Sequence, residues 1–117
     1  MENHGVVGVL VGEEGEKIRC SIAVRAEQSR KELEEQVQRE HSDANISLRR
    51  MYAFSCKGNV VDVETGLRKI LCQEFGPYTP ARFGLEGYTV KNIDKFMEYV
   101  DKKVKLIDSV IAVQEIQ

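Results

Sequence analysis

The sequence contains few cysteines and histidines, and this limits the chemistry that it can support. Three cysteines and two histidines occur in 117 residues. Cys20, Cys56 and Cys72 show no Cys-x-x-Cys spacing, and their odd number does not suit a disulfide framework. His4 and His41 have no partner at the spacing that is typical of zinc ligands. We therefore expect reduced thiols and no zinc site.

Long hydrophobic runs and a surplus of one charge are lacking as well. The longest apolar run, residues 5–12, is much shorter than the roughly 20 residues that a membrane-spanning helix requires. A signal peptide carries lysine or arginine before its apolar stretch, and residues 1–4 include neither. The formal net charge of −2 disfavours a protein that coats nucleic acid non-specifically, because such binding depends on lysine and arginine. We expect a cytoplasmic protein without membrane contact.

The common motifs of nucleotide-binding enzymes and hydrolases are also missing. The sequence has no GxxxxGK[ST] motif and no GxGxxG motif between a strand and a helix. It has no GxSxG elbow, and no serine or cysteine near His41 has the features of a nucleophile. These absences argue against P-loop enzymes, dinucleotide-dependent enzymes and hydrolases with a catalytic triad.

The composition that remains is typical of one folded domain. Hydrophobic residues make up 42% of the chain and charged residues 31%, as in ordinary globular proteins. A length of 117 residues suits a single hydrophobic core. We therefore treat residues 1–117 as a single domain.

Hydrophobic periodicity predicts both strands and helices. The first segment is rich in valine and suits a strand that is buried on both faces. In a later strand Leu48, Tyr52 and Phe54 are expected on one face, and Asn59 is a good N-cap for the second helix. We predict strands at residues 5–12, 17–22, 48–55 and, in short form, 87–90, and helices at residues 25–40, 59–75 and from 91 or 92 onward. This order predicts an α+β fold, a small three-stranded antiparallel sheet flanked by helices.

The tail, residues 105–117, carries more aliphatic side chains than a free terminus would. Val110, Ile111, Val113 and Ile116 lie within eight positions of one another. The tail can extend the third helix, form an edge strand or pack on a partner. Docking on the domain's own core and use as a homodimer or host-protein interface both stay open.

Arginine and glutamate residues near the ends of the predicted elements are the candidates for catalysis. Arg30 lies in the first helix, Glu64 in the second, and Glu86 where a loop enters the short strand. A carboxylate can hold a divalent cation, and a guanidinium can stabilise the charge that develops on a phosphate. Such a pair is the minimum equipment for metal-assisted phosphodiester cleavage. The alternative is that Arg30 is a solvated charge on an exposed helix.

Six short segments occur in the order strand, strand, helix, strand, helix, strand. They are GVVGVLV, KIRCSI, RKEL beginning at Arg30, RRMYAFS, ETGLRKIL beginning at Glu64, and EGYTV beginning at Glu86. In this order and in these segments, followed by the last helix, the chain resembles the GIY-YIG nuclease superfamily and its divergent phage and virus-associated branch over residues 5–104. The resemblance implies a GIY-YIG-like fold, a phosphate-stabilising role for Arg30 and a magnesium-binding role for Glu86.

The signature positions of that superfamily are only partly present. Residues 7–10 lack the tyrosine of the first signature, and Arg19 replaces the glycine that follows Lys17 and Ile18 in the second. No residue can be assigned the role of the tyrosine at the attacking water. The resemblance therefore implies the fold more than the activity. A non-catalytic descendant or an unrelated α+β binding protein is favoured over a working nuclease.

Two further groups of side chains are candidates for binding a partner. One is an aromatic and basic loop, which can stack on bases or anchor a protein. The other is a pair of arginines at the start of a strand, which can contact phosphate. The members are Tyr78, Arg82, Phe83 and Tyr88 in the loop, and Arg49 and Arg50 in the strand. A loop that caps the sheet and an exposed strand end are the structural alternatives.

These observations give three hypotheses. The first is a non-catalytic interaction protein on a degenerate GIY-YIG-like fold that binds a host or phage protein or DNA without a cofactor. The resemblance implies that a phage or mobile element encodes it. The second is a magnesium-dependent DNA endonuclease that uses Arg30 and Glu86. The third is a homodimerisation module that uses the C-terminal tail.

Overall fold

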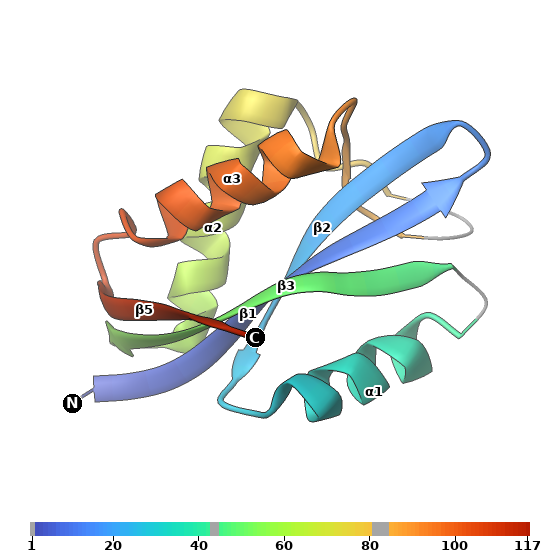
Figure 1. The fold of residues 1–117 in the computed structure, drawn as a ribbon. Coiled ribbons are helices and arrows are strands. Elements are labelled where there is room, and N and C mark those ends of the chain that lie inside the picture. The colour runs from blue at the N-terminus through green and yellow to red at the C-terminus, as the bar shows by residue number, and fades with distance from the viewer. Residues whose placement is uncertain (1, 43–44, 81–84) are drawn as a thin grey trace.

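The structure, a computed structural model, describes residues 2–42, 45–80 and 85–117. Within these residues it contains five strands and three helices (Figure 1). In chain order they are β1 (Glu2–Glu14), β2 (Lys17–Ala26), α1 (Arg30–Glu40), β3 (Ile46–Lys57), α2 (Val60–Phe75), β4 (Tyr88–Thr89), α3 (Ile93–Val104) and β5 (Val110–Ile116). The fold is therefore mixed α and β, as predicted.

The sheet has five strands, in the order β4-β2-β1-β3-β5, and every neighbouring pair is antiparallel. The prediction of a three-stranded sheet was wrong because both edge strands were omitted from it. β4 is only two residues long and pairs with Arg19 and Cys20. β5 is formed by the tail, which pairs with β3 over residues that lie more than 50 positions earlier. Pairing over such a separation leaves no local signal in the sequence.

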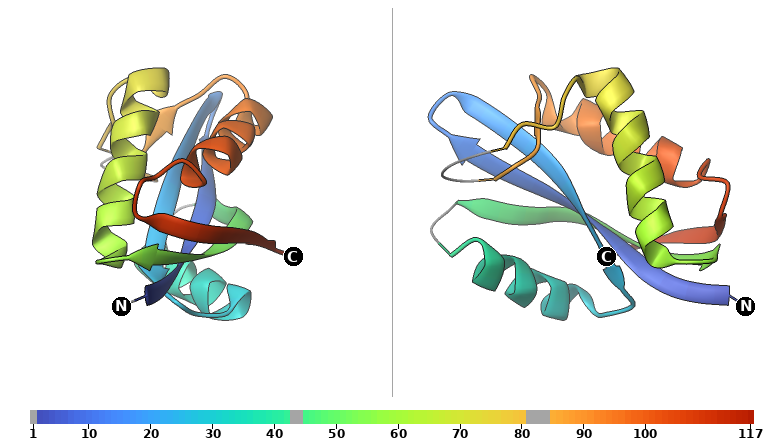
Figure 2. Two further views of the ribbon diagram at one scale, coloured as in Figure 1. Left: turned by 90° about the vertical axis from the view of Figure 1, so that its left-hand side faces the viewer. Right: turned by 180° about the vertical axis from the view of Figure 1, so that it is seen from behind.

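Helices cover both faces of the sheet (Figures 1 and 2). α2 and α3 pack on one face, where Val7, Val9 and Val11 of β1 point, and α1 packs on the other, where Val6 and Leu10 point. All five of these valine and leucine side chains are at most 4% exposed. This confirms the prediction that the first strand is buried on both faces, since the central strand of a layered sheet has no solvent side.

A β-bulge in β3 changes the face on which its side chains lie. Val9 of β1 pairs with Arg50, and the next residue, Leu10, pairs with Leu48, so Arg49 is an extra residue in β3. Leu48 consequently packs on the α1 side, whereas Tyr52 and Phe54 belong to the core under α2 and α3. The prediction that Leu48 shares a face with Tyr52 and Phe54 was wrong, because strict alternation fails at a bulge.

The helix ends are set by capping side chains. Asn59 caps α2 and accepts a hydrogen bond from the Val61 amide at 3.0 Å, as predicted. α1 begins at residue 30, later than expected, because Ser29 is its N-cap and forms a capping box with Glu32. The Ser29 hydroxyl accepts from the Glu32 amide, and the Ser29 amide donates to the Glu32 carboxylate, each at 3.1 Å. Residues 25 and 26 belong to β2 instead.

Candidate interaction surface

The outer backbone edge of β5, Val110–Ile116, is the most prominent unpaired feature of the fold; we call it the β5 edge. β5 pairs with β3 on one side, from Cys56↔Val110 to Met51↔Ile116. On its other side no strand pairs with it among residues 2–42, 45–80 and 85–117. Its sequence, VIAVQEI, has one charged residue in seven and contains neither proline nor glycine. An edge strand of this kind is a template for pairing with another chain.

At the opposite edge of the sheet, the outermost strand is the short β4. β4 contributes only two residues, and a bridge between Thr79 and Gly87 precedes it. Each of these two amides donates to the other residue's carbonyl, at 2.8 and 3.0 Å. A very short edge strand offers few backbone groups to a partner. The two edges therefore differ: at one, β4 pairs with β2 at Arg19 and Cys20, and at the other a seven-residue strand is outermost over its whole length.

The turn between α3 and β5 presents apolar side chains next to the β5 edge. Leu106 is 62% exposed and Ile111 is 50% exposed. Between them Ile107 is buried in the core, and the Lys57 amide donates to the Ser109 carbonyl at 2.8 Å. These contacts fix where β5 begins. Leu106 on this anchored turn and Ile111 on β5 are therefore held in fixed, exposed positions.

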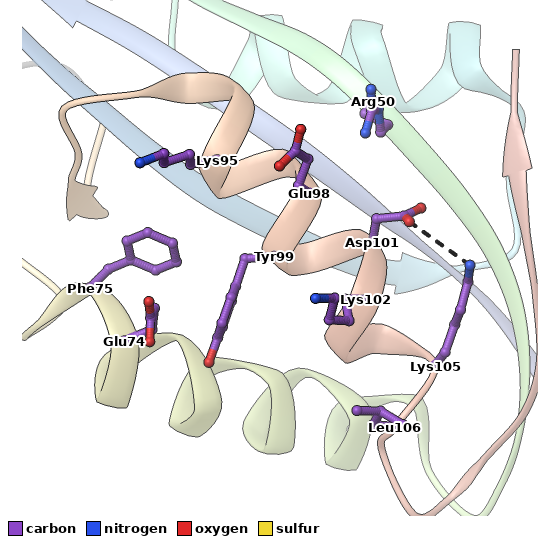
Figure 3. Close-up of a pocket in the computed structure, with 10 residues that line it drawn as sticks. All are labelled: Arg50, Glu74, Phe75, Lys95, Glu98, Tyr99, Asp101, Lys102, Lys105 and Leu106. Atoms are coloured by element: carbon purple, nitrogen blue, oxygen red, sulfur yellow. Dashed lines mark ion pairs between the residues drawn. The ribbon is translucent and has the colours of Figure 1, made fainter.

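A hollow of about 800 Å³ lies on the α3 side of the molecule (Figure 3). The Phe75 and Tyr99 rings form part of its wall and meet edge to face, with centroids 5.3 Å apart. Its charged residues carry both signs, and Lys105 pairs with Asp101 at 3.9 Å. The residues that line it are Arg50, Glu74, Phe75, Lys95, Glu98, Tyr99, Asp101, Lys102, Lys105 and Leu106. The hollow shares Leu106 with the exposed turn, so it is continuous with the surface beside β5.

Arg50 joins the hollow to β5. Its Nε atom lies 3.8 Å from a carboxylate oxygen of Glu115 on β5, and Arg50 lines the hollow together with Glu98 and Asp101 of α3 (Figure 3). Below Arg50, the Tyr52 hydroxyl is buried and has no hydrogen-bond partner among the described residues. Burial raises the pKa of Tyr52 to about 12, although the neighbouring Arg50 acts in the opposite direction. Tyr52 therefore stays neutral at physiological pH.

The other arginine of the predicted pair takes a different position. The Arg49 side chain is exposed, and its Nε donates to the Ser47 hydroxyl at 2.9 Å. The bulge at Arg49 separates its setting from that of Arg50, which faces α3. The two adjacent arginines therefore lie in different surroundings and do not form one basic patch.

The predicted catalytic pair is not joined in the structure. Arg30 is the first residue of α1, and its side chain donates to Glu34 at 3.0 Å and to the Leu48 carbonyl at 3.1 Å. Glu86 is exposed, in the segment before β4. No ion pair or hydrogen bond connects Arg30 with Glu86 in the part of the chain that the structure describes. Within that part, no group of three or more histidine, cysteine, aspartate or glutamate side chains is placed to hold a metal ion.

The predicted aromatic loop is partly built into the core. Tyr88 is fully buried, and its hydroxyl donates to the Arg68 carbonyl at 3.2 Å. The half-buried Tyr78 ring meets Tyr88 edge to face at 5.5 Å, and the Arg68 guanidinium lies 4.6 Å from the Tyr78 ring centre. Arg82 and Phe83 lie outside the described residues. Tyr78 is therefore the aromatic ring of this loop that the structure places within reach of solvent.

The cysteines are placed as isolated side chains. Cys20 and Cys56 are buried, Cys72 is exposed, and all three are free. Burial raises the pKa of Cys20 to about 12 and also raises that of Cys56. Both buried thiols are therefore protonated and act as small core side chains.

No protein-family model, curated protein or solved structure matches the chain. The resemblance to the GIY-YIG superfamily therefore stays a prediction. No described helix has the length and apolar character needed to cross a bilayer.

The candidate surface was only partly predictable from the sequence, because it depends on how distant segments are placed in the fold. The aliphatic side chains of the tail were noticed, but the exposed Leu106 and the position of Glu115 were not, because they depend on how the tail pairs with β3.

Proposed function

We propose that this chain is a protein-binding module that accepts an additional β-strand at the β5 edge. The observation that carries the proposal is the contrast between the two edges of the sheet. One edge ends in a two-residue strand, and the other in a seven-residue strand with a single charge. Sheets usually protect a long edge with lysine, proline or a covering segment, and the β5 edge has none of these among the described residues.

Strand addition also uses what the rest of the fold supplies. β5 is held by six register pairs to β3, so its outer backbone groups are presented by a preformed template. Main-chain hydrogen bonds then give affinity, and side chains beside the strand give specificity. Ile111 on the strand and Leu106 on the turn supply exposed apolar contact area next to that template.

The proposal can be tested by selecting strand-forming ligands. A displayed library of short random peptides is selected on the chain, and the binding of the selected peptides is then measured for Ile111→Lys and Val61→Lys. Val61 is the matched control, because it is 61% exposed but lies on α2. We expect Ile111→Lys to weaken peptide binding at least about tenfold, because it removes the apolar contact area that Ile111 contributes. Val61→Lys should leave binding unchanged.

Amide hydrogen exchange locates the bound peptide. Peptides that slow exchange in β5 and extend the sheet support strand addition. Peptides that bind equally well to Ile111→Lys and protect amides around Tyr99 instead would place the interaction in the hollow and contradict the proposal. This measurement uses the folded chain and does not require a natural partner.

A further inference from the structure

We infer that the strand taken up at the β5 edge is β5 of a second copy of this chain, paired antiparallel about Val113. This inference rests on the proposed function and names the partner. Two five-stranded sheets would then join into one continuous sheet through a two-fold axis. A two-fold interface uses the same surface on both copies, so each contact occurs twice.

The register follows from the strand itself. With Val113 opposite Val113 of the second copy, Ala112 faces Gln114 and Ile111 faces Glu115 of the other strand. The regular register ends at Ile111, which is an extra residue of β5 against β3, because Ser55 pairs with Ala112 and Cys56 with Val110. β-branched side chains thus meet at the centre of the pair. Such pairs stabilise antiparallel strands. No like charges come opposite one another, because Glu115 is the only charged residue of β5.

Charge complementarity favours a second copy over an unrelated strand. Glu115 pairs in register with Tyr52, whose side chain faces the α2 and α3 side of the sheet, so Glu115 points to that side as well. Lys105 lies on the same side, on the turn that leads into the beginning of β5. In the antiparallel pair, the end of one β5 lies beside the beginning of the other. Each Glu115 therefore approaches Lys105 of the second copy, and the pair occurs twice.

One exposed apolar side chain fits the same arrangement. Leu106 and Ile111 flank the beginning of β5, and Ile116 lies at its end, only partly buried by Leu48 and its neighbours. Pairing about Val113 covers Ile111, which faces Glu115 of the other copy, whereas Ile116 lies on the α1 side of the sheet, away from Leu106. Among the described residues, the interface thereby covers one large exposed hydrophobic side chain, and Val61 lies elsewhere on α2.

The test is the oligomeric state of the full chain by sedimentation equilibrium. A pair of edge strands makes a small interface, so we expect a monomer–dimer equilibrium with a dissociation constant between about 1 µM and 1 mM. Ile111→Glu should abolish the dimer, because it places two carboxylates opposite each other at each Ile111–Glu115 pair, and Val61→Glu should preserve it. Lys105→Glu and Glu115→Lys should each weaken association about tenfold, because each creates two like-charge contacts. The double variant should restore it, and this restoration is specific to antiparallel self-pairing.

The outcomes separate the inference from the proposed function. A monomer at every concentration, or a dimer that the single charge reversals leave unchanged, overturns the self-pairing. If such a chain still binds selected peptides in an Ile111-dependent way, the strand-binding function stands without it. Circular dichroism of each variant shows that the fold is retained, and the restored double variant provides a second check, because a misfolded single variant would not be rescued.

Discussion

Gly87→Ala should destabilise the chain, and Gly66→Ala should stabilise it. At Gly87 a Cβ atom would lie 2.3 Å from the Cys20 carbonyl oxygen and 3.0 Å from its carbon. Both are backbone atoms of β2, which is paired with β1 over ten residues and cannot move away. At Gly66, in α2, the nearest atoms are the Ile107 Cδ1 and Cγ2 at 3.4 and 3.7 Å, which is ordinary contact.

The magnitudes follow from these contacts. Overpacking against a fixed neighbour costs about 1–3 kcal/mol, and loss of the two hydrogen bonds between Gly87 and Thr79 adds about 1 kcal/mol each. We therefore expect Gly87→Ala to lower the free energy of unfolding by about 3–5 kcal/mol. Gly66→Ala removes backbone freedom from a helix interior and should raise the free energy of unfolding by about 0.5–1 kcal/mol.

Urea unfolding is the appropriate assay. A shift of the midpoint at constant m reports a change in stability alone. In thermal unfolding, each kcal/mol should move Tm by about 4 °C in a domain of this size. A Gly87→Ala variant within about 0.5 kcal/mol of the parent, the range of ordinary surface substitutions, would refute the reasoning. It would mean that β4 does not lie against β2 at this edge of the sheet.

Three further predictions concern single groups. Ser29→Ala should lower the free energy of unfolding by about 1 kcal/mol, measured in urea, because α1 loses its N-cap; an unchanged midpoint would contradict the capping box. Tyr52 has a pKa of 10.0 when unfolded and about 12 when folded, so its contribution to stability is complete below pH 10 and is lost as the pH rises through 12. The difference in absorbance at 295 nm between the parent and Tyr52→Phe should therefore titrate near pH 12, and a midpoint near 10 would show an exposed phenol. Plasmid DNA with magnesium should stay uncut, because Glu34 and the Leu48 carbonyl engage the Arg30 guanidinium; nicking that disappears in Glu86→Ala would overturn this.

Local patterns in the sequence were sufficient for the elements that depend on local forces. The valine-rich run of β1 and the Asn59 cap of α2 could both be predicted, because burial and capping act within a few residues. The Ser29 capping box has an equally local signature, and applying it would have placed the start of α1 correctly. The prediction instead extended the helix through residues that pair with β1.

The remaining features depend on contacts between distant segments. β5 could not be assigned because its sequence suits a helix or a strand, and pairing with β3 decides between them. The bulge at Arg49 has no signature in LRRMYAFS, yet it reverses the side on which Leu48 lies. For the same reason the predicted relation between Arg30 and Glu86 could not be judged from spacing. The β5 edge, which carries the proposed function, exists only because the strand order puts the last strand outermost.

The position of β1 at the centre of the sheet sets a gradient of local stability. β1 pairs with β2 on one side and with β3 on the other, so opening it breaks two ladders, whereas opening β5 breaks one. Amides of β1 should exchange with solvent only when the whole domain unfolds, and those of β5 should exchange through smaller openings. The strand that faces a partner is thus one that can detach and return while the rest of the sheet stays folded.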